Sequence, residues 1–156
     1  MKRVTGLGGL FFKSDDPEKL YDWYEKHLGI ARVQGAVTFN WCDADEPTRS
    51  GMTVWAIFPR DSKYFDPSRA GFMMNFRVAD LDGLLEKLQE KGVEIDSHRE
   101  DSDYGRFAWI MDPDGNRIEL WEPPSPVKPT KKSAKKTTSG ANRKSSKKPK
   151  AKKKRH

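Results

Sequence analysis

The chain has 156 residues, and its 30 Lys and Arg against 23 Asp and Glu give a formal charge of +7. That average hides two parts, because residues 125–156 hold fourteen basic residues and no acid, which leaves 16 basic against 23 acidic residues, a charge of −7, in residues 1–124. No segment approaches the roughly 20 apolar residues of a membrane helix, and the single Cys42 excludes an internal disulfide, so we expect a cytoplasmic protein without membrane contacts.

The first half of the body reads as one strand, one helix and further strands. Residues 7–13 form an apolar run, followed by Asp16 as a helix N-cap and Pro17 at the first helical position. Apolar residues spaced three and four apart then continue to Gly29, which predicts the end of an amphipathic helix. Residues 36–41 and 52–58 read as the strands that follow.

The second half repeats this order. A strand at 71–78 leads to Asp80 as a cap and to a leucine stripe, and Asp80 lies 64 residues after Asp16, as Phe76 does after Phe12. Three strands are expected after this helix, at residues 93–98, 107–111 and 117–122.

We therefore predict an α+β domain over residues 1–124, built from two βαβββ halves at about 5–60 and 70–123. One helix covers only one face of a four-stranded sheet, so the other face needs a ligand or the other half, and two halves side by side would enclose a cleft. The loop at residues 59–70 would join the halves and could also act as a lid.

The last strand carries a lone carboxylate. Side chains alternate along a strand, so Ile118 and Leu120 would face a core while Glu119 faces the other way. Glu119 is either a general base or ligand-binding group in a cavity, or a residue paired with Arg106, Arg117 or another cation.

Three runs resemble one known family. They are WYEKHLGI at 23–30, FRVADLDGLLEKLQEKGVEI at 76–95 and DPDGNRIELWEP at 112–123. Together they resemble the vicinal oxygen chelate superfamily, which contains glyoxalase I, bleomycin and fosfomycin resistance proteins and extradiol dioxygenases. The match covers residues 5–123. It implies the paired βαβββ fold and a homodimer.

The resemblance also implies where metal ligands would lie. Members that use a metal take ligands from the opening strand and a later strand of each half, and these positions fall here at Gly9, Met73, Trp55 and Glu119. Glycine, methionine and tryptophan are not ligands for a divalent ion in an oxygen or nitrogen site. We expect a protein without a metal cofactor.

Strand alternation around these positions predicts the pocket lining. Phe11 and Lys13 share a face with Gly9, and Asn75 and Arg77 share one with Met73. Lys13 and Arg77 would favour an anionic or polar ligand, whereas the strand aromatics fit either a pocket for a flat ligand or the core. Besides Glu119 as the catalytic candidate, the expected ligand-binding residues are Phe11, Lys13, Trp55, Met73, Asn75, Arg77, Tyr104, Arg106 and Trp121.

Three functions stay open. The first is binding of a small organic molecule without a metal, as in the bleomycin-resistance branch. The second is an enzyme, either a lyase or isomerase of glyoxalase type with Glu119 as base or another member of the dioxygenase superfamily. The third rests on residues 125–156, a Lys-rich tail expected to be disordered, whose residues 128–156 could contact nucleic acid or another polyanion nonspecifically and favour a nuclear or nucleoid location.

Overall fold

The structure is a computed structural model that describes residues 3–124. The expected disorder of residues 125–156 and the expected nucleic-acid contact of residues 128–156 lie outside the described residues. No helix of the described part is long and apolar enough to cross a membrane.

The first half contains three strands and one helix. Strand β1 (Val4–Ser14) leads into α1 (Pro17–Leu28), and β2 (Val37–Cys42) and β3 (Ser50–Pro59) follow. These strands match the three expected at residues 7–13, 36–41 and 52–58, whereas the further strand of the βαβββ order does not form among the described residues of this half. Between α1 and β2 the described chain forms only an isolated bridge from Val33 to Ala36, because a tight turn with positive φ separates these residues.

The second half has the full predicted order. It consists of β4 (Phe72–Val78), α2 (Leu81–Glu90), β5 (Ile95–Ser102), β6 (Gly105–Met111) and β7 (Arg117–Glu122). A short 3₁₀ helix, η1 (Lys63–Phe65), lies in the linker between the halves. The helix signals are confirmed: Asp16 accepts a hydrogen bond from Lys19 N and Asp80 from Gly83 N, both at 3.0 Å.

All seven strands form one sheet in the order β2-β3-β1-β4-β7-β6-β5. Strands β1 and β4 are antiparallel neighbours, with Gly9 opposite Asn75 and Phe11 opposite Met73. Met73 lies 64 residues after Gly9, and Asn75 lies 64 residues after Phe11, so the offset of the repeat relates the two pairs to each other. The two halves are therefore related by an approximate local two-fold axis that passes near the pair of Leu10 and Met74.

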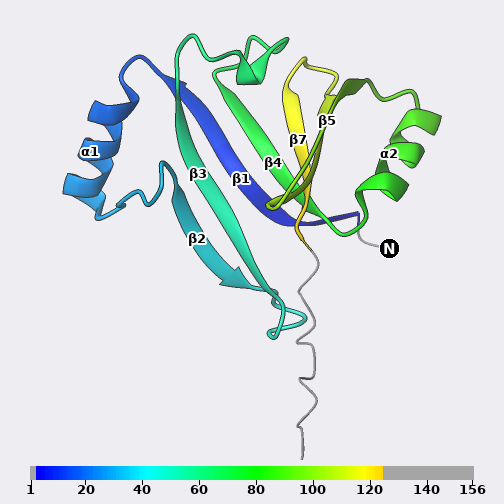
Figure 1. Cartoon of the computed structure of the whole chain (residues 1–156), viewed down its shortest axis with the longest axis horizontal. Coiled ribbons are helices and arrows are strands. Elements are labelled where there is room, and N and C mark those ends of the chain that lie inside the picture. The colour runs from blue at the N-terminus through cyan, green and yellow to red at the C-terminus, as the bar shows by residue number, and fades with distance from the viewer. Residues whose placement is uncertain (1–2, 125–156) are drawn as a thin grey trace, which may run out of the picture. The chain divides into compact units, whose positions relative to one another are not determined.

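Both helices lie on one face of the sheet, which we call the helix face, and Figure 1 shows them at its opposite ends. Tyr21 of α1 packs with Val37 and Ile57, and Leu81 of α2 packs with Leu120. Full burial of such a leucine contributes about 1.5–3 kcal/mol, so these clusters anchor each helix to its half.

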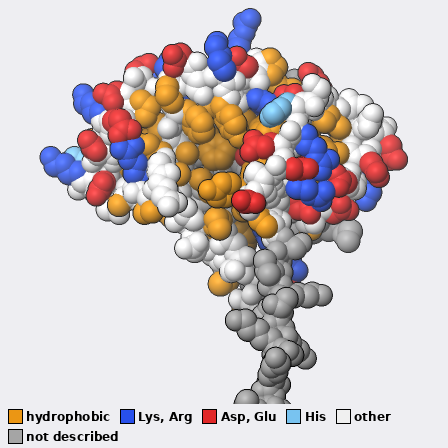
Figure 2. Space-filling model, viewed as in Figure 1, with side chains coloured by type: hydrophobic (Ala, Val, Ile, Leu, Met, Phe, Trp, Pro, Cys, Tyr) orange, Lys and Arg blue, Asp and Glu red, His pale blue; other side chains and the backbone are white. Residues whose placement is uncertain are grey.

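The opposite face, which we call the inner face, carries a third apolar cluster. Phe11, Ala56, Met73 and Trp109 come from four different strands, and Phe65 reaches them from η1. Figure 2 shows hydrophobic side chains gathered in a hollow in the middle of the surface, with charged side chains toward both ends.

Candidate functional site

Glu119 lies at the centre of the inner face and is only 2 % exposed. In β7 its neighbours Ile118 and Leu120 pack against the α2 cluster on the helix face, so the predicted alternation is confirmed. Pairing of β4 with β7 places Asn75 directly beside Glu119. The carboxylate is therefore held by the middle of the sheet.

Three neutral groups donate hydrogen bonds to this carboxylate. Asn75 Nδ2 donates to Oε1 at 2.5 Å, and Trp109 Nε1 donates to Oε2 at 3.0 Å. The Tyr64 hydroxyl also donates to Oε2. Among the ion pairs of residues 3–124, none involves Glu119. Burial raises the pKa of Glu119, and the hydrogen bonds from Tyr64, Asn75 and Trp109 offset only part of that rise.

The pH dependence of stability should report this raised pKa. Between the unfolded and the folded pKa of Glu119 the folded state binds more protons, so the contribution of Glu119 to the free energy of unfolding falls as pH rises through this window. We expect wild type to lose unfolding free energy relative to Glu119→Gln when the pH is raised from about 4 to about 8. Urea denaturation across this range measures the difference, and a shift in favour of wild type would contradict the expectation.

The linker between the halves covers the carboxylate, as the predicted lid would. Phe65 is fully buried in the inner-face cluster, while Tyr64 beside it is 36 % exposed and turns its hydroxyl inward to Glu119. Arg117, also on the inner face, holds this segment by donating to the Tyr64 carbonyl oxygen at 2.7 Å. Its other amino group pairs with Asp96 at 2.7 Å.

Several predicted residues are brought together here. Phe11 and Met73 belong to the inner-face cluster, Asn75 donates to Glu119, and Lys13 Nζ lies 4.9 Å from the centre of the Phe65 ring. These four residues come from β1 and β4 and lie on the face that carries Glu119, because the two opening strands are neighbours in the sheet.

Two further predicted residues lie on the same face with partners of their own. Arg77 Nη1 donates to Thr5 Oγ1 at 3.2 Å. Trp121 stacks with Phe107 at a ring distance of 6.4 Å and donates from Nε1 to a carbonyl oxygen at 2.8 Å. Neither makes a hydrogen bond to Glu119.

The placement of Trp55 is a correction. Its ring lies on the helix face, 5.8 Å from that of Tyr21 and 4.6 Å from that of Tyr24. Phe11 pairs with Ala56 in the first half, and its counterpart Asn75 pairs with Glu119 in the second half. Ala56 is therefore the counterpart of Glu119. The first half has one residue more between these positions, which moves Trp55 to the other face.

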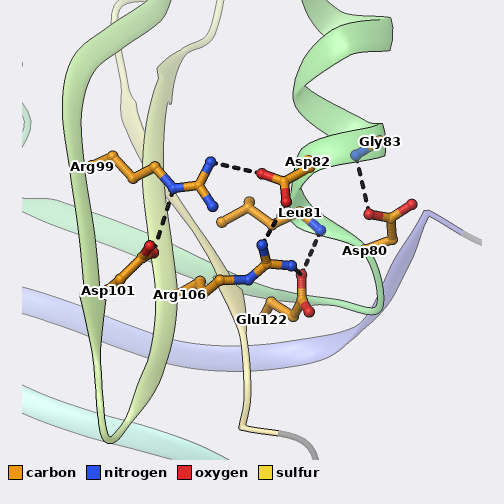
Figure 3. A network of polar contacts seen from close by, with 8 residues as sticks. All are labelled: Asp80, Leu81, Asp82, Gly83, Arg99, Asp101, Arg106 and Glu122. Carbon is orange, nitrogen blue, oxygen red and sulfur yellow. Dashed lines mark hydrogen bonds and ion pairs between the residues drawn. The ribbon is translucent and has the colours of Figure 1, made fainter.

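The placement of Arg106 is a second correction. Figure 3 shows its guanidinium at the start of α2, where it contacts Asp82 and Glu122, each at 2.5 Å. Glu122 also accepts a hydrogen bond from Leu81 N at 2.7 Å. Arg106 therefore neutralises carboxylates that hold the first turn of α2.

Tyr104 is a third correction. It lies in the turn between β5 and β6 and is 79 % exposed, and only its carbonyl oxygen, which accepts from Trp121 Nε1, contacts the inner-face residues. The turn directs the side chain into solvent.

Sequence reasoning did not assign Phe58, Tyr64 and Phe65 to the site, and it left Trp109 open between pocket and core. Tyr64 and Phe65 cover it from the linker, Phe58 stacks on Tyr64, and Trp109 donates to Glu119. The available signal was the adjacent pair Tyr64 and Phe65 in an otherwise polar linker.

The residues present do not fit a divalent metal. The corrected positions that the family resemblance implies are Gly9, Ala56, Met73 and Glu119, of which only Glu119 carries a suitable oxygen. Within residues 3–124 no three His, Cys, Asp or Glu side chains gather as a metal site. Function without a metal stays a prediction.

Comparison with known proteins agrees with this fold. Methylmalonyl-CoA epimerase from Mycobacterium tuberculosis aligns with 24 % identity and a TM-score of 0.50, covering 78 % of this chain and 90 % of the other. A variant of the Streptomyces coelicolor epimerase in complex with 2-nitronate-propionyl-CoA aligns with 19 % identity and a TM-score of 0.56, covering 78 % and 99 %. At these identities the likeness concerns the fold alone.

No curated protein sequence matches the chain. The family model described as Glyoxalase/Bleomycin resistance protein/Dioxygenase superfamily matches residues 10–120, which include the second part of β1, all of β4 and Glu119. The chain therefore belongs to the glyoxalase/bleomycin resistance protein/dioxygenase superfamily.

Proposed function

We propose that the chain binds a small organic molecule on the inner face, over Glu119, without a divalent metal. The observation that carries this proposal is a buried carboxylate in an apolar, largely aromatic surrounding. Small-molecule sites combine an apolar lining with a few fixed polar groups. Phe11, Met73 and Trp109 supply the lining, and Asn75 and Glu119 the polar groups.

The burial of Glu119 also supports a role in binding. A buried carboxylate costs stability unless it is paired, and three neutral donors offset only part of that cost. Replacement by an apolar residue would relieve the cost, so its presence in the core of the inner face supports a function in recognition.

A thermal-shift screen of small carbonyl compounds, thiol adducts and aromatic antibiotics tests this proposal. Ligands should raise the melting temperature of wild type and of Glu86→Gln, a matched change on the exposed side of α2. Glu119→Gln should weaken binding about tenfold or more, since a hydrogen bond to a charged group contributes about 1.5–3 kcal/mol.

Two results would reject the proposal. One is full ligand affinity in Glu119→Gln. The other is stoichiometric Zn, Ni, Mn or Fe in the purified protein, lost together with ligand binding on chelation. The expected homodimer is a separate prediction, and light scattering of the purified chain measures it.

A second candidate is a lyase or isomerase in which Glu119 removes a proton next to a carbonyl group. The raised pKa of Glu119 favours it, because a base works best with a pKa near the working pH. Asn75 and Lys13 remain as groups that could stabilise an enolate, whereas Arg106 lies at α2 and Arg77 is bonded to Thr5. Solvent deuterium entering a bound carbonyl compound would favour this candidate over simple binding.

A further inference from the structure

We infer that the molecule bound over Glu119 is an organic cation, a primary ammonium group carried on a flat apolar group. This inference rests on the proposed function and names the class of its ligand. It replaces the preference for an anionic ligand that Lys13 and Arg77 suggested in the sequence.

The first observation is a charge without a counter-charge. Among residues 3–124, Arg117, the other buried ionic side chain of the inner face, pairs with Asp96, while Glu119 has only neutral donors. Neither Lys13 nor Arg77 forms an ion pair with Glu119 within this range; Lys13 lies over Phe65 and Arg77 bonds to Thr5. A bound cation would supply the missing charge, and an anion would be repelled.

The second observation is a free acceptor beside the carboxylate. Asn75 is 3 % exposed, its Nδ2 donates to Glu119, and its Oδ1 has no hydrogen-bond partner among the described residues. A buried acceptor without a partner is unfavourable, because it loses its hydrogen bonds to water and gains none in the folded protein. A primary ammonium carries three donors and no acceptor, which matches the adjacent acceptors Glu119 and Asn75 Oδ1 better than a hydroxyl with its single donor.

The third observation is a set of aromatic rings around the position of the Tyr64 ring. This ring is stacked on Phe58 at 5.3 Å and 5° and meets Phe11 and Trp109 edge-on at 6.5 and 6.1 Å. Cations are attracted to the faces of such rings. The chain already shows this at the edge of the site, where Arg117 Cζ lies 4.9 Å from the centre of the Trp109 ring.

Tyr64 itself indicates how the ligand enters. Its hydroxyl donates to one acceptor position of Glu119, and the residue is 36 % exposed and lies on a helix of three residues. A charged N–H donor bonds to a carboxylate about twice as strongly as a neutral donor. An ammonium group would therefore displace the Tyr64 hydroxyl, and the flat group would take the space between Phe11, Phe58 and Trp109.

Calorimetric titration with three probes of similar size tests the inference: benzylamine, benzyl alcohol and benzoate. Wild type and Glu86→Gln should bind benzylamine at least tenfold more tightly than benzyl alcohol, and benzoate more weakly still. Glu119→Gln should remove the preference for the amine. Tyr64→Phe, which keeps the ring but loses the competing hydroxyl, should bind benzylamine about tenfold more tightly than wild type.

The ranking in wild type decides the inference even if Glu119→Gln fails to fold. If benzyl alcohol or benzoate binds as tightly as benzylamine, the inference that the ligand is a cation is overturned. The proposed function would still stand if Glu119→Gln weakens binding of that probe. Weaker binding of benzylamine to Tyr64→Phe than to wild type would overturn the displacement of the hydroxyl. Absence of binding by these probes and by every compound of the screen would overturn the inference and the proposed function together.

Discussion

Replacing Phe65 by alanine should lower the free energy of unfolding by about 3–5 kcal/mol, the usual cost of removing a buried phenylalanine ring. Phe65 is fully buried and packs with Phe11, Ala56, Met73 and Trp109. It comes from the linker between the halves, so the same change should also release Tyr64 from Glu119.

Urea denaturation measures the first effect. Acrylamide quenching of tryptophan fluorescence reports the second as a rise in quenching relative to wild type, because Trp109, one of five tryptophans, would lose its cover. Phe39→Ala is the matched control, because Phe39 lies on the edge strand β2 and is 46 % exposed. Its replacement should cost no more than about 1 kcal/mol. Equal losses in the two variants would show that the linker contributes little to the inner face.

Replacing Gly8 by alanine should lower the free energy of unfolding by about 1–3 kcal/mol and displace the side chain of Asn75 in the site. A Cβ at this position would lie 2.1 Å from Asn75 Oδ1 and 2.9 Å from Trp121 Cε3. Asn75 would have to move, and Glu119 would then lose the donor that lies 2.5 Å from Oε1.

Gly71→Ala is the control for this prediction, since a Cβ there would meet nothing within 4 Å. Gly71→Ala should stay within about 0.5 kcal/mol of wild type. Gly8→Ala should also bind any ligand of the site more weakly than Gly71→Ala does. Equal stability and equal affinity in the two variants would mean that Asn75 does not depend on the close approach of Gly8.

Much of the fold was predictable because its signals are local. Asp16 and Asp80 cap the two helices through hydrogen bonds to residues three positions later, and the spacing between the two caps revealed the repeat. The alternation of Ile118, Glu119 and Leu120 depends only on the geometry of one strand, and it placed Glu119 correctly on the inner face.

The errors arose where a position depends on the register between strands. One additional residue in the first half moved Trp55 to the helix face, and no periodicity within a single strand reveals such a shift. Arg106 lies opposite Glu122 in the hairpin of β6 and β7, so it faces α2 and contacts Asp82.

By itself the sequence determined two related halves, their capped helices and a lone acid on the face opposite them, since these follow from short-range periodicity and capping. Only the tertiary structure decided what surrounds that acid. The bond from Tyr64 to Glu119 joins residues 55 positions apart, and the bond from Asn75 joins residues 44 apart. Such contacts form when the strands pair and the linker folds onto the sheet, and no local pattern specifies them.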